Sequence, residues 1–321
     1  MYANPQIEQM SRKDMENLQL ARLNKTLKWA LEKSRFYQEK LSDAESAELE
    51  SLKDIQRLPL TNFAELLKKP KLEFLTMPMS SVLRISLQHH PMEVAKLYSN
   101  GDIAHNVEMM TRILVAGDVN QTSVAGLLGD LSDSRLLDVH YALELLGAAS
   151  VPLGTDFHRA VALMELSQLD TLITTPQLAM QLIIQTQTMG KDIGEYPLQR
   201  IFCLNEALLN PLRRHLEERT GARVYDLFSS VELGTAAMLF SCAADFGVHV
   251  QEDYFYPEII EFGSERIIED SSKMGELVVT TLGAEAMPLI RYRTGQAVMR
   301  VESACPCGRT LLRIITPFGR S

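Results

Sequence analysis

The sequence predicts a mixed α/β protein in which a mostly parallel sheet, with helices on its faces, is followed by a smaller lobe rich in strands. Two observations lead to this fold class. Between Ser123 and Phe228, short apolar runs alternate with helical stretches, which is the βαβ pattern of a parallel sheet. After Glu232 the segments become strand-like and are joined by short turns. We expect a helical segment over residues 1–80, an α/β parallel-sheet subdomain over 81–235, and a β-rich lobe over 236–321.

An amphipathic helix is expected to open the fold. Apolar side chains recur at helical spacing from Asp14 to Leu41. The segment Leu58-Pro-Leu-Thr-Asn62 then interrupts this periodicity. Either Thr61 or Asn62 is suited to cap a helix that runs through Leu67.

The α/β region divides into alternating strands and helices. We place strands at Val124–Leu128, Ser150–Leu153, Thr171–Thr174, Ile201–Leu204 and Arg223–Phe228. We place helices near Leu136–Leu146, Arg159–Ser167, Pro176–Thr188 and Pro211–Thr220. Ligands of parallel sheets bind beyond the carboxyl ends of the strands, which here include the turn after Phe228.

The last third is expected to form a more antiparallel lobe, because its strand-like segments are joined by short turns. These segments are Val248–Phe262, Gly275–Leu282, Met287–Val301 and Thr310–Ile315.

Charge and composition exclude several classes of function. The 32 basic and 41 acidic residues give a net charge of −9 without any basic stretch, so nucleic acid is not an expected partner. The N-terminus lacks a signal pattern, and no apolar run reaches the roughly 18 residues that span a bilayer. We therefore expect a cytoplasmic protein without a membrane partner. The common nucleotide-binding and hydrolase fingerprints, such as Walker A and G-x-S-x-G, are absent.

Three of the four cysteines and one histidine form a pattern typical of a structural zinc site. Cys242 and His249 flank a turn that contains Gly247, while Cys305 and Cys307 flank a proline and lead into a glycine. This last arrangement lets two thiolates face one point, and the other pair would complete a Cys₃His tetrahedron with no position left for water. Free thiols and a surface histidine are the alternative, and the residues alone leave both readings open.

Ordered motifs along the chain point to one family. The sequence contains Leu18-Gln-Leu-Ala-Arg-Leu23 with Phe36-Tyr37, Leu58-Pro-Leu-Thr61, Tyr225-Asp-Leu-Phe-Ser-Ser-Val-Glu232, Glu252-Asp253, Pro257-Glu-Ile-Ile260, Gly275-Glu-Leu-Val-Val-Thr-Thr-Leu282, Pro288-Leu-Ile-Arg-Tyr-Arg-Thr-Gly295, Cys307-Gly-Arg309 and Gly319-Arg-Ser321. With these motifs, the chain resembles the phenylacetate–CoA ligase family of adenylate-forming enzymes, from about residue 13 to its last residue.

The resemblance implies the fold of the large N-terminal domain of adenylate-forming enzymes, and an activity. Such an enzyme activates an aryl or related carboxylic acid with ATP and magnesium to an acyl-adenylate, then passes the acyl group to coenzyme A. Glu232 is implied to be the catalytic carboxylate that helps hold magnesium, although spacing alone favours a solvated carboxylate at a helix start. The residues implied to bind the nucleotide are Glu206, Tyr225, Asp226, Phe228, Ser229, Ser230, Gln296 and Arg320.

The sequence departs from the family pattern where phosphate and ribose are bound. The segment Ile85–Tyr98, which replaces the family's phosphate loop, contains no glycine, so the close backbone approach of an anion-binding nest is lost. His89, His90 and Lys96 still offer positive charge there. Gln296 replaces the aspartate that grips the ribose hydroxyls, which removes a charge-assisted pair.

Two hypotheses follow from the resemblance and these departures. The family's small C-terminal domain would begin at Gly319-Arg-Ser321, so we expect that domain to be absent and thioester formation to need a separate polypeptide in trans. The first hypothesis is an acid-activating ligase, impaired or assisted by such a partner. The second is a non-catalytic relative that binds an acyl or aryl ligand or a partner protein. Both hypotheses are compatible with a homodimer.

Overall fold

The structure is a computed structural model of the 321-residue chain, and it describes residues 1–42, 48–88, 94–205, 211–228 and 231–316. The chain folds into two compact units that are interleaved in the sequence. Unit 1 contains residues 1–3, 106–230 and 234–245, and unit 2 contains residues 4–105, 231–233 and 246–321. The expected division into three consecutive regions stays a prediction.

Unit 1 is built on a mostly parallel sheet with the strand order β4-β3-β5-β6-β7-β8, in which only β8 is antiparallel to its neighbour. The strands are β3 (Val124–Leu128), β4 (Ala149–Gly154), β5 (Thr171–Thr174), β6 (Arg200–Asn205), β7 (Arg223–Phe228) and β8 (Leu239–Phe240). Because β3 and β5 are buried along most of their length, their sequences read as continuous apolar runs rather than alternating ones.

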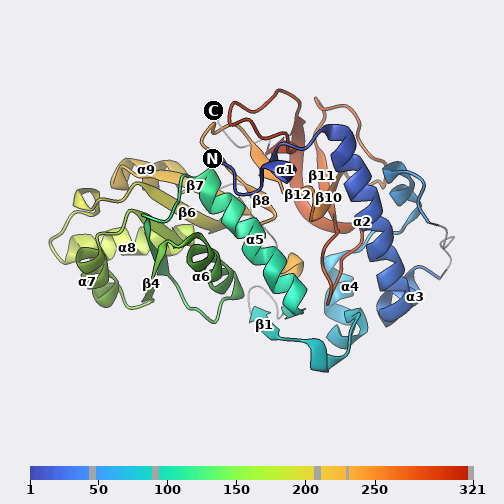
Figure 1. The fold of residues 1–321 in the computed structure, drawn as a ribbon, viewed down its shortest axis with the longest axis horizontal. Helices are drawn as coiled ribbons and strands as arrows, with labels where there is room; N and C mark the ends of the chain where they lie inside the picture. Colours follow the sequence, from blue (N-terminus) through green and yellow to red (C-terminus); the bar gives the residue numbers. More distant parts are fainter. Residues whose placement is uncertain (43–47, 89–93, 206–210, 229–230, 317–321) are drawn as a thin grey trace. The chain divides into compact units, whose positions relative to one another are not determined.

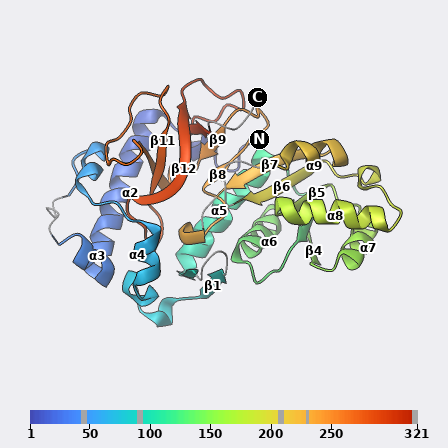
Figure 2. The same ribbon diagram turned by 180° about the vertical axis from the view of Figure 1, so that it is seen from behind.

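Helices cover both faces of this sheet (Figures 1 and 2). On one face, α7 (Phe157–Ser167), α8 (Pro176–Thr188) and α9 (Arg213–Thr220) pack on the strands through one apolar cluster. On the other face lie α6 (Ser134–Leu146) and the part of α5 (Asn100–Ala116) that belongs to unit 1. At the end of α5, a Cβ on Gly117 would come within 2.5 Å of the Phe202 ring, so glycine permits this close packing.

Unit 2 contains an antiparallel sheet with the strand order β10-β11-β12-β13-β9. Its strands are β9 (Val248–Val250), β10 (Phe255–Ile260), β11 (Gly275–Thr281), β12 (Tyr292–Val301) and β13 (Arg313–Ile315). A separate hairpin pairs β1 (Arg84–Gln88) with β2 (Val94–Tyr98). The unit also contains α1 (Pro5–Glu8), α2 (Arg12–Lys33), α3 (Arg35–Lys40), α4 (Phe63–Lys68) and the 3₁₀ turns η1 (Leu52–Arg57), η2 (Lys71–Phe74), η3 (Met79–Ser81) and η5 (Val231–Leu233).

The N-terminal helices of unit 2 are attached to strands from the end of the chain. Gln19 of α2 donates a hydrogen bond to the Glu252 carbonyl at 2.9 Å, and Thr26 donates to the Leu282 carbonyl. The buried Tyr37 hydroxyl of α3 accepts from the Ile290 amide. Residues more than 230 positions apart therefore form one packed unit.

Most of the expected elements are confirmed, with informative differences at several places. The single expected N-terminal helix is two helices, because Ser34 adopts an extended conformation and caps α3. Asn62 caps α4 in a capping box with Glu65. The expected strand Val248–Phe262 is divided by a turn after β9, and α5 and the β1–β2 hairpin were not expected. Among the described residues, no helix combines the length and the apolar content needed to cross a bilayer.

Candidate functional site

Strand β1 of the β1–β2 hairpin has an inverted pattern of burial, whereas Leu97 and Tyr98 of β2 are buried. Ile85 and Leu87 of β1 are 62% and 49% exposed, whereas Ser86 between them is only 5% exposed. Ser86 pairs directly with Lys96 of β2, which is 7% exposed. A strand at a protein surface normally turns its apolar side chains inward. The hairpin instead directs a hydroxyl and an ammonium group inward.

The ammonium group of Lys96 lies beside Glu232. Its Nζ donates hydrogen bonds to the backbone carbonyls of Glu232 at 3.1 Å and Met287 at 2.8 Å. Burial lowers the pKa of Lys96 to about 8, and the nearby charges of Asp102 and Glu232 oppose that shift. Lys96 therefore stays mostly protonated at neutral pH and supplies a buried positive charge.

Glu232, in η5, has a buried carboxylate oxygen without a partner. Its Oε2 and the Oγ of Ser86 are both buried and form no hydrogen bond within the described residues. The Tyr292 hydroxyl hydrogen-bonds to the Glu232 carboxylate, and burial, followed by the charge of Glu232, raises the pKa of Tyr292. Buried polar atoms without partners are rare in folded proteins, and a bound ligand or ion is a common reason for them. We call Ser86, Lys96, Glu232 and Tyr292 the Glu232 group.

The chemistry of the Glu232 group fits a cation together with an anion. A free carboxylate oxygen suits Mg²⁺, which proteins hold with one or two carboxylates and the phosphates of a substrate. A hydroxyl and an ammonium group suit phosphate oxygens. These residues therefore fit magnesium and a nucleotide phosphate, although the glycine-free hairpin lacks the backbone nest of a phosphate loop.

The predicted adenine-side residues lie in unit 1, along β7. Tyr225 is buried and stacks on Phe202 with 5.0 Å between ring centroids, and burial raises its pKa. Asp226 accepts from Arg213 at 3.0 Å and from Asn205 at 2.9 Å. Phe228, at the end of the strand, is buried. Successive side chains alternate across a sheet, so Tyr225 and Asp226 occupy opposite faces. A nucleotide-binding role for these residues stays a prediction.

Several predicted site residues cannot be placed. Glu206, Ser229, Ser230 and Arg320 lie outside the described residues, as do His89 and His90. Gln296 is partly buried in β12, immediately after Gly295, whose positive φ of 69° suits glycine.

The structure brings the predicted zinc ligands of unit 2 together. The ligand atoms of His249, Cys305 and Cys307 lie within 4.8 Å of one another, and His249 Nε2 is 3.4 Å from Cys307 Sγ. His249 is fully buried, so the alternative of a surface histidine is wrong. Cys242, the fourth predicted ligand, is buried in unit 1, and its part in the metal site stays a prediction.

The electrostatics of the zinc ligands favour a positive charge at their centre. Burial lowers the pKa of His249, but hydrogen bonds with Cys305 and Cys307 outweigh burial and raise it. For Cys305 the directions are opposite. Burial raises the pKa of its thiol, but hydrogen bonds from His249 and the Cys307 amide outweigh burial and lower it. The thiolates thus attract a proton where a divalent metal would bind. In this position, Zn²⁺ would replace the proton.

The backbone around these ligands is tightly constrained. Gly247, just before β9, has φ 74°, and a Cβ there would lie 3.0 Å from the Ile314 carbonyl oxygen. Gly308 closes the Cys305-Pro-Cys turn with its amide bonded to the Cys305 carbonyl at 3.0 Å. Arg309 then forms a buried ion pair with Glu8 at 2.6 Å. Each of these contacts holds the ligand-bearing turns in place.

Two members of the Glu232 group were not found by sequence reasoning. Ser86 and Tyr292 carry polar groups in strands, where they resemble ordinary alternating residues. A signal existed for the hairpin, because Lys96 is a lone charge within the apolar run Val94-Ala-Lys-Leu-Tyr98 and Ser86 separates two apolar residues. Recognising the inverted pattern required knowing that the apolar side faces solvent.

Known proteins with similar sequence and structure indicate the class to which this fold belongs. No family model matches the chain. Phenylacetate–coenzyme A ligase of Thermus thermophilus is 26% identical over all of this chain and 74% of its own length. The enzyme of the same name from Escherichia coli is 28% identical over 98% of this chain and 73% of its own length. A crystal structure of 2-hydroxyisobutyryl-CoA ligase in the postadenylation state superimposes with a TM-score of 0.88 at 20% identity, over 98% of this chain and 70% of that one.

These similarities identify the fold as that of the adenylate-forming acid–coenzyme A ligases. Within that class, the chain is a homologue of the phenylacetate–coenzyme A ligases. It spans about three quarters of the length of those relatives.

Proposed function

We propose that this protein activates a small carboxylic acid with ATP, with Glu232 as the residue that holds magnesium. In this reaction the acid's carboxylate oxygen attacks the α-phosphorus of ATP, the bond to the β-phosphate oxygen breaks, and pyrophosphate leaves with the displaced electron pair. The product is an acyl-adenylate, whose acyl group can then pass to the thiol of coenzyme A. An aryl acid is the substrate class suggested by the names of the homologues.

The inverted hairpin is the observation that supports this proposal most directly. Ser86 and Glu232 each keep a buried oxygen without a partner, and Lys96 adds a buried ammonium beside them. Maintaining such groups lowers stability unless a ligand satisfies them. Magnesium, when bound, would neutralise phosphate charge next to Glu232, and the Ser86 hydroxyl and Lys96 ammonium would bind phosphate oxygens.

We propose further that adenylate formation is slow compared with a family member that keeps the glycine-rich phosphate loop and the charged ribose ligand. The hairpin has no glycine to form an anion-binding nest, and Gln296 stands in place of the charged ribose ligand. Loss of even one donor that stabilises a transition state lowers a rate by about 10²–10³-fold.

Pyrophosphate exchange tests the proposed activity. The purified chain is mixed with ATP, magnesium, labelled pyrophosphate and one acid at a time, from acetate to phenylacetate and benzoate. We expect label to enter ATP only with magnesium and with at least one acid, because the step is reversible. A folded protein that binds no Mg·ATP by calorimetry and exchanges no label with any acid would refute the proposal.

A non-catalytic relative is the second candidate function, and the position of Lys96 favours it. The Lys96 ammonium already interacts electrostatically with Glu232 and Asp102. It therefore supplies the positive charge that a magnesium ion would otherwise provide. In that case the fold would bind an acyl ligand or a partner protein without phosphate chemistry. Mg·ATP would then bind no more tightly to the natural protein than to a Glu232→Gln variant.

We propose also that Cys242, His249, Cys305 and Cys307 hold a structural zinc ion. The Cys₃His donor set leaves no position for water, so zinc would stabilise the fold rather than take part in the reaction. The support lies in the buried, mutually close ligands of unit 2 and in electrostatics that favour a positive charge between them.

Replacing Cys307 by serine is expected to lower zinc content and stability together. The natural protein should retain about one equivalent of zinc, and Cys307→Ser should lose most of it and melt roughly 4–8 °C lower, as a loss of about 2 kcal/mol implies for a fold of this size. Cys203→Ala, which changes a buried cysteine of β6 outside the group, should keep its zinc. Metal analysis and thermal melts provide the two readouts, and unchanged zinc in Cys307→Ser would contradict the assignment.

A further inference from the structure

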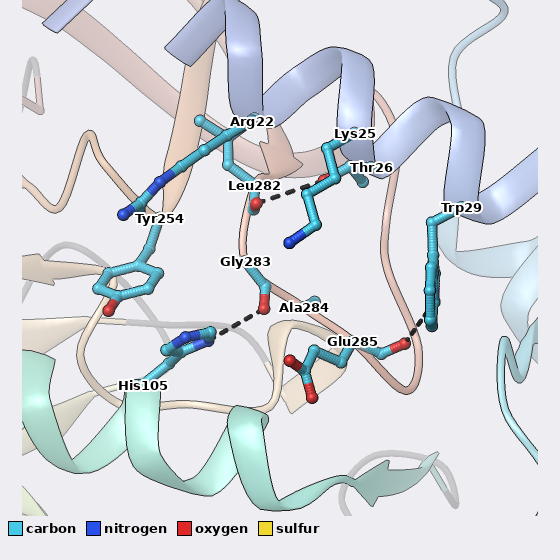
Figure 3. A pocket seen from close by; sticks show the side chains of 10 residues that line it. All are labelled: Arg22, Lys25, Thr26, Trp29, His105, Tyr254, Leu282, Gly283, Ala284 and Glu285. Carbon is cyan, nitrogen blue, oxygen red and sulfur yellow. Dashed lines mark hydrogen bonds between the residues drawn. The ribbon is translucent and has the colours of Figure 1, made fainter. Parts of the chain in front are cut away.

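A cavity of about 240 Å³ opens in unit 2, apart from the Glu232 group (Figure 3). Its walls are one face of α2, the start of α5 and the loop between β11 and β12. It shares no lining residue with the Glu232 group. The ten lining residues are Arg22, Lys25, Thr26, Trp29, His105, Tyr254, Leu282, Gly283, Ala284 and Glu285.

The α2 face that lines the cavity is unusually polar. Arg22, Lys25, Thr26 and Trp29 follow the i, i+3, i+4, i+7 spacing of one helix face. Such a stripe is apolar when it packs on a core. Here it presents two cations, a hydroxyl and an indole, which is the composition of a binding surface.

Three backbone carbonyls of the cavity loop already accept hydrogen bonds. Thr26 donates to the Leu282 carbonyl at 3.3 Å, His105 Nδ1 donates to the Gly283 carbonyl at 3.1 Å, and Trp29 Nε1 donates to the Glu285 carbonyl at 3.2 Å (Figure 3). A ligand that needs acceptors therefore finds few here. A ligand that brings its own acceptors is favoured.

The available donor is the Lys25 ammonium, which points into the cavity (Figure 3). Lys25 forms no hydrogen bond or ion pair with any described part of the chain. Arg22, by contrast, is held by the Asp253 carbonyl and lies 5.0 Å from the Tyr254 ring centroid. The ligand's negative group should therefore meet Lys25, the one cation of the lining without a partner within the described residues.

Aromatic side chains line both ends of the cavity (Figure 3). Tyr254 packs against His105 with ring centroids 4.8 Å apart, and the Trp29 indole lies at the other end. Aromatic walls favour a flat ring. The volume lies below the usual range for drug-sized ligands, which suits a single ring rather than a nucleotide.

The Glu285 carboxylate limits the ligand's charge. It accepts a hydrogen bond from Ser99 at 2.6 Å and packs on Gly101, where a Cβ would come within 2.3 Å of its oxygen. The Glu285 carboxylate therefore places a negative charge at the cavity wall, beside the N-terminus of α5, where the helix dipole stabilises such a charge. A second negative charge on the ligand would be repelled by this carboxylate.

We infer that this cavity is a binding site for a small aromatic monoanion, whose carboxylate pairs with Lys25 and whose ring lies between the aromatic walls. The site is independent of the proposed activity, because it requires neither ATP nor Glu232. It would let the protein sense an aryl acid at a position other than the one where such an acid would be activated.

Tryptophan fluorescence tests this site selectively, because Trp29 is the only tryptophan of the chain. Phenylacetate is titrated into the full chain without ATP or magnesium, and its uncharged isostere phenylacetamide is titrated in parallel. We expect a saturable change in fluorescence with phenylacetate, a dissociation constant in the millimolar range or tighter, and much weaker binding of the amide. Calorimetry provides the second measurement.

Two matched variants decide the role of the ammonium. Lys25→Gln should raise the dissociation constant about tenfold, because it removes a hydrogen bond between charged groups. Lys28→Gln removes the same charge one turn further along α2, outside the lining, and should leave binding unchanged. Glu232→Gln should also leave it unchanged.

Four results would overturn the inference: no saturation up to roughly 10 mM by either method, equal binding to Lys25→Gln and Lys28→Gln, equal binding of acid and amide, or loss of binding in Glu232→Gln. Failure of pyrophosphate exchange would bear only on the proposed activity and would leave this result standing.

Discussion

A Glu232→Gln variant is expected to lose magnesium-dependent pyrophosphate exchange by at least about 10²-fold, which corresponds to roughly 2.7 kcal/mol of transition-state stabilisation. Glutamine has the same shape but no charge, so it can still fill the space in η5 while binding a divalent cation poorly. The measurement is the initial exchange rate at saturating ATP over a range of magnesium concentrations. We expect the variant's residual rate to depend far less on magnesium.

The control for this variant is Glu265→Gln, which makes the same change at an exposed position. It should exchange pyrophosphate at the natural rate. Both variants should have the circular dichroism spectrum of the natural protein, which separates a lost activity from a lost fold. Equal rates in the two variants would show that Glu232 does not hold the cation, and would favour the non-catalytic alternative.

Replacing Arg291 by methionine is expected to destabilise unit 2 by about 3–5 kcal/mol. Arg291 and Glu258 form an ion pair at 3.0 Å, and both side chains are fully buried. The guanidinium also donates to the Leu58 carbonyl at 2.6 Å, which ties the segment before α4 to the strands. Methionine fills much of the volume, but it leaves the Glu258 carboxylate buried without a counter-charge.

Urea unfolding measures this loss, with Arg300→Met as the matched control. Arg300 lies in β12, the strand that begins one residue after Arg291, and is exposed, so its replacement should change the free energy of unfolding by no more than about 0.5 kcal/mol. A double variant, Arg291→Met with Glu258→Met, should recover much of the stability, because no buried charge remains unpaired. Similar stabilities of the two single arginine variants would contradict this account.

The sequence was most informative where burial and periodicity agree. The strands β3, β5 and β7 were predicted to the residue, because each is bounded by turn residues and buried along most of its length. The helix α8 was also predicted to the residue, because Thr175 caps it and Pro176 occupies its first turn. The break between α2 and α3 was missed because Ser34 interrupts an apolar periodicity that continues on both sides. Local pattern cannot distinguish one bent helix from two that are capped separately.

The candidate sites were predictable only in part, for a physical reason. Cys305 and Cys307 are close in sequence and chemically distinctive, so their pairing with His249 could be predicted from spacing. The Glu232 group comes from three distant segments and depends on which face of a hairpin is buried. The aromatic cavity depends likewise on contacts between α2 and a loop more than 250 residues later. Tertiary packing forms both the Glu232 group and the aromatic cavity, and no local sequence motif predicts that packing.

The interleaving of the two units sets the order in which a growing chain can fold. Helix α2 is made before its hydrogen-bond partners on the β-rich side, because the carbonyls of Glu252 and Leu282 follow it by more than 230 residues. The roughly 140 residues between positions 105 and 246 need on the order of 10 s of translation. Unit 1 can complete its sheet during that interval, while α2 waits with the side chains that will meet the late strands uncovered. Nascent chains stalled before residue 246 should therefore engage chaperones through residues 4–105, and unit 2 should close only after the segment from residue 246 onward has been made.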